Sequence, residues 1–229
     1  MEYNEFNQPI GKKVVGFQVP ILPNALSIEG RYCRLEKLKP KHGEGLYAHF
    51  GTVEDLPNWT YLPDEQPKDL EAFQVYLNKK FETKDPYFFA IIDKQTEQAV
   101  GIIALLRIDQ SNGSIEVGHI HYANILKRTR IATEVQFLLA RYVFETLGYR
   151  RYEWKCDALN KPSIKAAKRL GFKYEGVFRN HKVYKARNRD TCWLSIIDSE
   201  WPKYKQQYEK WLDEKNFDEL GNQIHRLSI

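Results

Sequence analysis

The stretch EVGHIHYANILKRTRIATEV, residues 116–135, decides the fold. Its first half continues an alternation of apolar and polar residues that begins at Ser114, which is typical of a β-strand. Its second half starts a helical spacing of apolar residues that continues to Tyr142, and Gly148 stands where a C-terminal cap is needed. A further strand is predicted at 151–158. Because a strand, a helix and a strand follow one another, we expect a crossover connection and a locally parallel pair of strands.

The remaining segments predict a sheet that is antiparallel outside this unit. The polar breaks KQTEQ and QSNG separate three strand-like runs, which is the pattern of a meander. No internal repeat is present. The order of the predicted strands and helices indicates a mixed α/β fold class, with a central, mostly antiparallel sheet and helices on both faces. The other predicted elements are strands at 26–38, 87–93, 99–109, 172–185 and 191–198, helices at 42–51, 69–81 and 160–170, and a loop at 56–67.

The same patterns divide the chain into three parts. Residues 1–25 mix proline, asparagine and glycine with short apolar patches, and we expect an extended arm laid on the domain. Residues 26–200 contain the predicted strands and helices and form the domain. Residues 201–229 are predicted to be a charged, helical tail.

The composition favours a reducing compartment. The three cysteines, Cys33, Cys156 and Cys192, are odd in number, widely spaced and without a C-x-x-C pair, which argues against a disulfide framework. No apolar run approaches the roughly 20 residues that cross a bilayer. The polar N-terminus MEYNEFNQPIGKK lacks the order of a signal peptide. We therefore expect a cytoplasmic protein that does not bind a membrane.

The charge pattern indicates an anionic ligand. The formal net charge of +5 suits a phosphorylated ligand but is too weak by itself to indicate nucleic acid. The basic loop before the long helix is a candidate phosphate site, because free N–H groups at a helix N-terminus bind anions. Arg128 and Arg130 could add bidentate, charge-assisted bonds. The alternative reading of this loop is a solvated basic turn.

Three blocks in this order resemble the acetyl-CoA-binding half of the GNAT superfamily, in its RimJ/RimL-like branch. They are the quoted stretch, DALNKPSIKAAKRLGF (157–172) and KYEGVFR (173–179), and the run NRDTCW (188–193) resembles a closer subgroup. The resemblance implies a parallel pair that splays apart to admit the pantetheine arm of acetyl-CoA. It also implies direct attack of a primary amine, on a small molecule or a protein N-terminus, on the thioester.

The resemblance implies roles for particular residues on the cofactor side. Backbone groups near Ile120 and Tyr122 would stabilise the oxyanion, and Asn160 would contact the pantetheine arm. The family's glycine-rich loop is altered, because Arg130 stands at the usual first glycine and only Ala132 keeps the small final residue. The residues expected to bind the pyrophosphate are Arg128, Thr129, Arg130, Ile131, Ala132 and Thr133.

Two side chains are predicted to move protons. Many relatives place a tyrosine acid four residues before the Gly-Phe pair, but that position is Ala167 here, so Ser163 becomes the candidate donor to the thiolate. Glu116 is the candidate for deprotonating the amine, with Asp190 as a second carboxylate. The alternatives without a catalytic role are a first-turn serine for Ser163, a solvent-facing strand glutamate for Glu116 and a turn aspartate for Asp190.

Aromatic and histidine residues leave further alternatives open. His119 and His121 share a strand face unless a bulge intervenes, and they are expected to line a pocket or the core, since no further metal ligands have supporting spacing. Trp59 and Tyr61 either close over the acceptor or form a hydrophobic plug. A CoA-binding module without efficient transfer and, last, a nucleic-acid binder are the competing functions. The expected partner is an amine-bearing small molecule or peptide, and a homodimer is compatible with the sequence.

Overall fold

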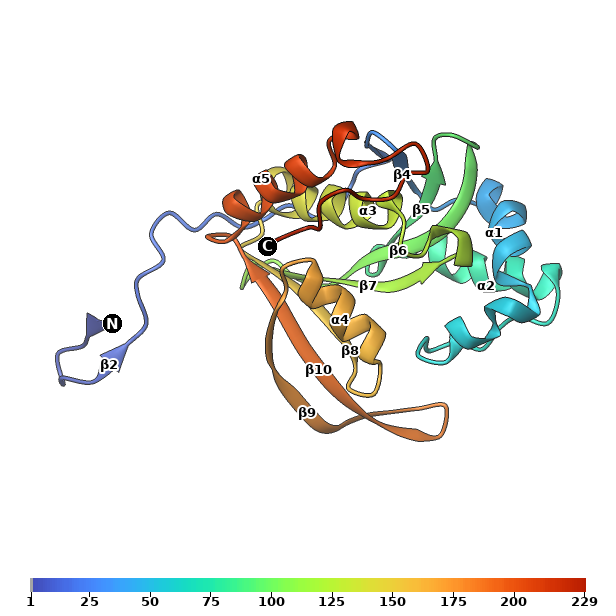
Figure 1. Ribbon diagram of the computed structural model, residues 1–229. Helices are drawn as coiled ribbons and strands as arrows, with labels where there is room; N and C mark the ends of the chain where they lie inside the picture. Colours follow the sequence, from blue (N-terminus) through green and yellow to red (C-terminus); the bar gives the residue numbers. More distant parts are fainter. Residues whose placement is uncertain (1) are drawn as a thin grey trace.

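The computed structural model describes residues 2–229 and contains an eight-stranded sheet in the order β3-β4-β5-β6-β7-β8-β10-β9 (Figure 1). All neighbouring strands are antiparallel except β7 and β8, which are parallel. The strands are β3 (Ser27–Glu29), β4 (Cys33–Lys37), β5 (Tyr87–Asp93), β6 (Gln98–Asp109), β7 (Ser114–Tyr122), β8 (Arg151–Asp157), β9 (Lys173–Tyr184) and β10 (Arg187–Ile197).

Helices cover both faces of this sheet. On one face Tyr152 and Trp154 of β8 pack against Phe172, which follows α4, and Tyr152 also packs against Phe144, which follows α3. On the other face α1 and α2 pack against β6 and β5. Helix α5 lies along α3 and therefore belongs to the first face (Figure 1). The helices are α1 (Gly43–Phe50), α2 (Leu70–Phe81), α3 (Arg130–Arg141), continued by a π-helical turn (Tyr142–Thr146), α4 (Lys161–Arg169) and α5 (Trp201–Trp211).

The helix N-termini form where the sequence provides capping side chains. The Asp69 carboxylate accepts a hydrogen bond from the Ala72 N–H at the start of α2. The Asn160 side-chain oxygen accepts from the Ser163 N–H at the start of α4. These bonds satisfy donors that have no partner within the helix, which confirms the predicted caps.

The parallel pair confirms the predicted crossover. Residues of β7 and β8 pair from Ser114 opposite Arg151 to Val117 opposite Trp154, and the two strands lose their pairing beyond that point. Three side chains of α3, Val135, Leu138 and Leu139, are fully or almost fully buried against the core. The amphipathic helix therefore fixes the connection between the two parallel strands.

Several predicted boundaries differ from the structure. The strand expected at 26–38 is two strands, because the Glu134 carboxylate accepts hydrogen bonds from the N–H groups of Arg31, Tyr32 and Cys33 at the turn between them. The loop expected at 56–67 begins within a 3₁₀ helix, Val53–Trp59. The β9–β10 turn is only Lys185 and Ala186, both at positive φ, as in a tight two-residue hairpin.

Both terminal segments also differ from expectation. The arm does not lie on the domain: its first residues, including the short strands β1 (Glu2–Tyr3) and β2 (Pro9–Ile10), extend away from it (Figure 1). Contacts with the domain include the Ile21 N–H, which donates to the Leu147 carbonyl. The tail is helical only to Trp211, apart from a 3₁₀ turn at Glu214–Asn216, and then returns along the domain as a non-helical segment.

Candidate functional site

A β-bulge in β7 lies where the two parallel strands part. Ile102 of β6 pairs with His121 and Ala104 pairs with Gly118, so His119 and Ile120 together stand opposite one residue of β6. His119 has φ of 49°, and the bulge interrupts the hydrogen-bond ladder beside Ile120. Backbone donors in this part of β7 are therefore available to a ligand that enters between the strands.

The start of α3 has the geometry of an anion site. Arg128 has φ of 64°, and the Thr129 hydroxyl caps the helix by accepting from the Ala132 N–H at 3.3 Å. The first backbone N–H groups of the helix, at Arg130 and Ile131, have no helical acceptor. They could therefore hold phosphate oxygens, as the sequence predicted.

The side chains of this loop and of the start of α3 differ in their exposure and in their partners. Arg128 is exposed, whereas the Arg130 guanidinium lies 4.2 Å from the ring centroid of Tyr32 and 5.6 Å from that of Phe217. The Thr133 hydroxyl is buried and accepts a hydrogen bond from Arg169 at 3.1 Å. Arg130 is thus held in place by aromatic faces, while the Thr133 side chain is already engaged within the protein.

Ser163 is held beside the parting strands from α4. The Trp154 indole N–H donates to the Ser163 hydroxyl oxygen at 3.0 Å, and Asn160 caps the helix through the Ser163 N–H. Because the hydroxyl oxygen accepts from the indole, its own proton is free to be donated elsewhere. The neighbouring Cys156 remains a thiol, since burial raises its pKa to about 11.

Glu116 is buried, which excludes the solvent-facing strand glutamate that was the alternative to the predicted base. Its side chain is 3% exposed, with the carboxylate 2.5 Å from the Arg107 guanidinium and 3.1 Å from the Lys155 ammonium. The parallel register sets Glu116 opposite Glu153, and the same Lys155 ammonium lies 2.6 Å from Glu153. Two carboxylates brought this close need a cation between them, which explains the burial of Lys155.

His119 lines a pocket of about 470 Å³ on the face that α1 and α2 cover. Its ring centroid lies 5.1 Å from that of Phe88, and the pocket wall also includes Tyr76 and an ion pair of Lys80 with Asp64 at 3.0 Å. Burial, and secondarily the Lys80 charge, lowers the pKa of His119 to about 4. The imidazole is therefore neutral near pH 7, and one of its ring nitrogens can accept a hydrogen bond.

His121 lies on the same face of the sheet as His119, two residues further along β7. His121 is buried, stacks on Phe50 with ring centroids 3.6 Å apart, and contacts the Asp55 carboxylate at 2.7 Å. Trp59 is 2% exposed and packs against His121 and Tyr76, so it is part of a hydrophobic plug. The sequence left open whether His119 and His121 line a pocket or the core, because the directions of these side chains depend on the one extra residue in β7.

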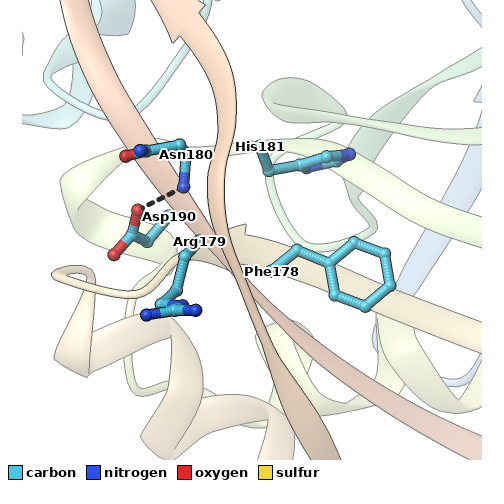
Figure 2. Close-up of a pocket in the computed structure, with 5 residues that line it drawn as sticks. All are labelled: Phe178, Arg179, Asn180, His181 and Asp190. Carbon is cyan, nitrogen blue, oxygen red and sulfur yellow. Dashed lines mark hydrogen bonds between the residues drawn. The ribbon is translucent and has the colours of Figure 1, made fainter.

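Asp190 is fixed within the β9–β10 hairpin. Its carboxylate accepts hydrogen bonds from the Asn180 N–H at 2.8 Å and from the Asn188 amide, and the first of these is drawn in Figure 2. These bonds lower the pKa of Asp190. Phe178 and His181 point away from Asp190, on the other side of the strand (Figure 2). Asp190 therefore stabilises the bulge at Asn180.

No group of three or more histidine, cysteine, aspartate or glutamate side chains within residues 2–229 could hold a metal ion. No helix in the same range has the length and hydropathy that a membrane span requires.

Comparison with known proteins identifies the family. A model of the acetyltransferase (GNAT) domain matches residues 33–173. The chain belongs to the GNAT acetyltransferase family. A GCN5-related N-acetyltransferase from Brucella melitensis has a crystal structure that is 45% identical, with a TM-score of 0.91 over 93% of this chain and 97% of that chain.

Two further proteins show the range of similarity. An uncharacterized N-acetyltransferase of Bacillus licheniformis, p20, is 34% identical over 49% of this chain and 63% of its own length, so the match spans less than two thirds of that relative. The microcin C7 self-immunity acetyltransferase MccE, solved in complex with acetyl-CoA and AMP, is 18% identical and shares the fold, with a TM-score of 0.64 over 73% of this chain and 93% of its own.

Proposed function

We propose that this protein is a cytoplasmic N-acetyltransferase of the RimJ/RimL-like branch that transfers an acetyl group from acetyl-CoA to a primary amine. The observation that carries the proposal is the parting of β7 and β8 after Val117 and Trp154, with a bulge on one strand and Ser163 beside the other. MccE, which shares this fold, was solved in complex with acetyl-CoA, which supports the same donor here.

Acetyl-CoA would bind along the side formed by α3 and α4. The N–H groups that begin α3, with Arg128 and Arg130, would hold the pyrophosphate, and Asn160 would contact the pantetheine arm. The thioester would then lie between the parted strands. Backbone N–H groups near Ile120 and Tyr122 would donate to the carbonyl oxygen as negative charge develops on it.

The reaction is a direct displacement. The amine nitrogen attacks the thioester carbon, and the carbon–sulfur bond breaks from the tetrahedral intermediate. The thiolate of CoA receives a proton through the Ser163 hydroxyl, which takes up a proton from solvent in the same step. The amine loses one proton during attack. No cysteine is required, which fits the buried Cys33, Cys156 and Cys192.

Two groups compete for the proton of the amine. Glu116 is the candidate from sequence, but its carboxylate is buried and is already engaged by Arg107 and Lys155. His119 is neutral, lines a pocket and stands on the bulge itself. We propose that His119 accepts the proton and that Glu116 holds Arg107 and Lys155 in position.

The experiment is a steady-state assay of CoA thiol release with acetyl-CoA and a panel of amines and peptides. The unmodified protein should release thiol only when an amine is present. Ser163→Ala and His119→Gln should lower kcat while leaving acetyl-CoA affinity nearly unchanged, because both act in the transition state. Acetyl-CoA binding without amine-dependent release from any member of the panel would indicate a binding module instead.

A further inference from the structure

Positive side chains from four strands converge beside the His119 pocket. They are Arg107 of β6, Lys155 of β8, Lys182 of β9 and Arg189 of β10, and the β9–β10 register sets Lys182 opposite Arg189. Burial and the charges of Arg107 and Arg189 lower the pKa of Lys182. The charges of Lys80, Arg107 and Lys182 act together on His119. Geometry links the members of this group, because Arg107 and Lys155 both contact Glu116 of β7 and the Lys155 ammonium lies 3.8 Å from the ring centroid of Trp193 in β10.

Two of these cations are neutralised within the protein and two are not. Arg107 and Lys155 contact Glu116, and Lys155 also contacts Glu153. In the part of the chain that the structure describes, neither Lys182 nor Arg189 has a carboxylate within 4.0 Å.

Arg189 carries a second sign of an absent partner. Its Nε atom is buried and forms no hydrogen bond within residues 2–229. A buried donor of a charged group costs free energy when it has no acceptor, so proteins place such donors where a ligand supplies one. The Arg189 side chain therefore has a donor left for an oxygen that the protein does not provide.

The nearby carboxylates already have partners. Asp64 pairs with Lys80, and Glu65 lies 3.2 Å from Lys185. Asp157 is 5% exposed and accepts hydrogen bonds from the Tyr184 hydroxyl and the Leu159 N–H. These three carboxylates are engaged within the protein, so a second ammonium group, as in a polyamine acceptor, would have to compete with their partners.

An aromatic wall adjoins the unneutralised cations. The Phe178 and Trp193 ring centroids are 4.5 Å apart, His181 lies 5.6 Å from Phe178, and the Thr191 hydroxyl is 2.9 Å from the His181 ring. Phe178 and His181 project to the same side of β9 (Figure 2), and both line an open depression of about 780 Å³ whose wall also includes Arg179, Asn180 and Asp190. The depression offers aromatic faces for the body of a ligand beside the positive charges.

We propose that the acceptor is an amine whose carbon skeleton also carries an anionic group, a carboxylate or a phosphate, which Lys182 and Arg189 hold while the amine faces His119. This inference rests on the proposed acetyl transfer and names the class of acceptor. Guanidinium and ammonium groups bind either anion by charge-assisted hydrogen bonds, so the two sources share one recognition chemistry.

The experiment compares acceptors that differ by charge alone. In the carboxylate arm, Ala-Glu amide is compared with Ala-Gln amide, and in the phosphate arm, O-phosphoethanolamine with ethanolamine, with spermidine as the cationic comparator. The anionic member of at least one pair should have a kcat/KM about tenfold higher or more, since a hydrogen bond to a charged group contributes about 1.5–3 kcal/mol. The arm that shows the preference identifies the anion.

Matched variants test the assignment to these side chains. Lys182→Gln and Arg189→Gln should each bring the ratio of kcat/KM for the anionic acceptor to that for the neutral acceptor closer to one, with little change in the KM for acetyl-CoA. Two variants are used so that the test still stands if one of them fails to fold. Lys203→Gln, an equal loss of charge on an exposed lysine of α5, should keep the preference. An equal rate for both members of each pair, a preference for spermidine, or a preference that survives both variants would overturn the proposal.

A binding measurement separates this inference from the proposed function. With CoA present, calorimetry should show tighter binding of N-acetyl-Ala-Glu amide than of N-acetyl-Ala-Gln amide, or of N-acetyl-phosphoethanolamine than of N-acetylethanolamine. If no amine is acetylated but this difference is present and Lys182→Gln removes it, the proposed turnover fails and the anion site stands. If amines are acetylated and neither pair shows a difference in rate or binding, only the anion site fails.

Discussion

The environment of His119 has a consequence for stability as well as for chemistry. Its pKa is about 4 in the folded protein and about 6.5 in an unfolded chain, so the unfolded state binds more protons between these values. The stabilising contribution is therefore fully present above about pH 6.5 and is lost as the pH falls towards 4. Replacing the histidine should remove this dependence.

We predict that His119→Gln loses less stability than the unmodified protein when the pH falls from 7 to 5, by on the order of 1–2 kcal/mol in the free energy of unfolding. Urea unfolding at the two pH values measures this difference. The other titrating groups are shared by both proteins and cancel in the comparison. An identical pH dependence would show that His119 is not buried in the neutral form.

Glu116 gives a second prediction at the scale of a residue. Glu116→Gln should reduce the free energy of unfolding by about 1–3 kcal/mol, because Arg107 loses its carboxylate and the buried Lys155 keeps only Glu153. Glu97→Gln, which removes an exposed partner of Arg34, is the control and should have a clearly smaller effect, because solvent screens exposed ion pairs. Urea unfolding at pH 7 distinguishes the two. Equal effects would contradict the buried role of Glu116.

At the scale of an element, the start of α3 is the proposed binding site for the pyrophosphate of acetyl-CoA. Arg128→Ala combined with Arg130→Ala should weaken acetyl-CoA binding by about tenfold or more, because two charge-assisted contacts to phosphate are lost. The rise in melting temperature on adding acetyl-CoA should shrink accordingly. Arg141→Ala, near the opposite end of the same helix, is the control. An unchanged ligand-induced shift in the double variant would place the pyrophosphate elsewhere.

The elements show what a sequence can and cannot predict. The bounds of β5, α2 and α4 followed from periodicity and from the caps at Asp69 and Asn160, because these signals are local. The break between β3 and β4 depends on Glu134, roughly one hundred residues away in the chain, and had no local signal. The burial of Glu116 likewise depends on Glu153 of a neighbouring strand.

The candidate site was predictable only in part, for the same physical reason. Ser163 and the α3 loop could be proposed because each lies at a helix start, which the sequence marks. His119 could not be assigned, because a one-residue bulge decides which way it points. Lys182 and Arg189 are ordinary surface charges in the sequence and become a cluster only through the β9–β10 register.

At the scale of the whole molecule, the two terminal segments should contribute differently to stability. Truncation before Gly16 should leave the melting temperature within about 2 °C of that of the full chain, because the N-terminal strands extend away from the domain (Figure 1). Removal of residues 213–229 should lower it by several degrees, because Phe217 packs on Tyr32 and Trp211 and the buried Asn216 bonds the Trp211 carbonyl. Calorimetry of both truncations tests this difference, and equal melting temperatures would contradict it.

In the proposed reaction, acetyl-CoA and an amine approach one opening in the sheet from opposite sides, and a single-turnover reaction with carbon-13-labelled acetyl-CoA tests direct transfer between them. The protein, in excess over the donor, is mixed with an acceptor amine and quenched over time, and mass spectrometry follows the label in protein and amine. The account predicts that the label moves to the amine and at no time to the protein, with one free CoA thiol released for each label transferred. A label on the protein before it reaches the amine, or a thiol released with no labelled amine, would contradict direct transfer.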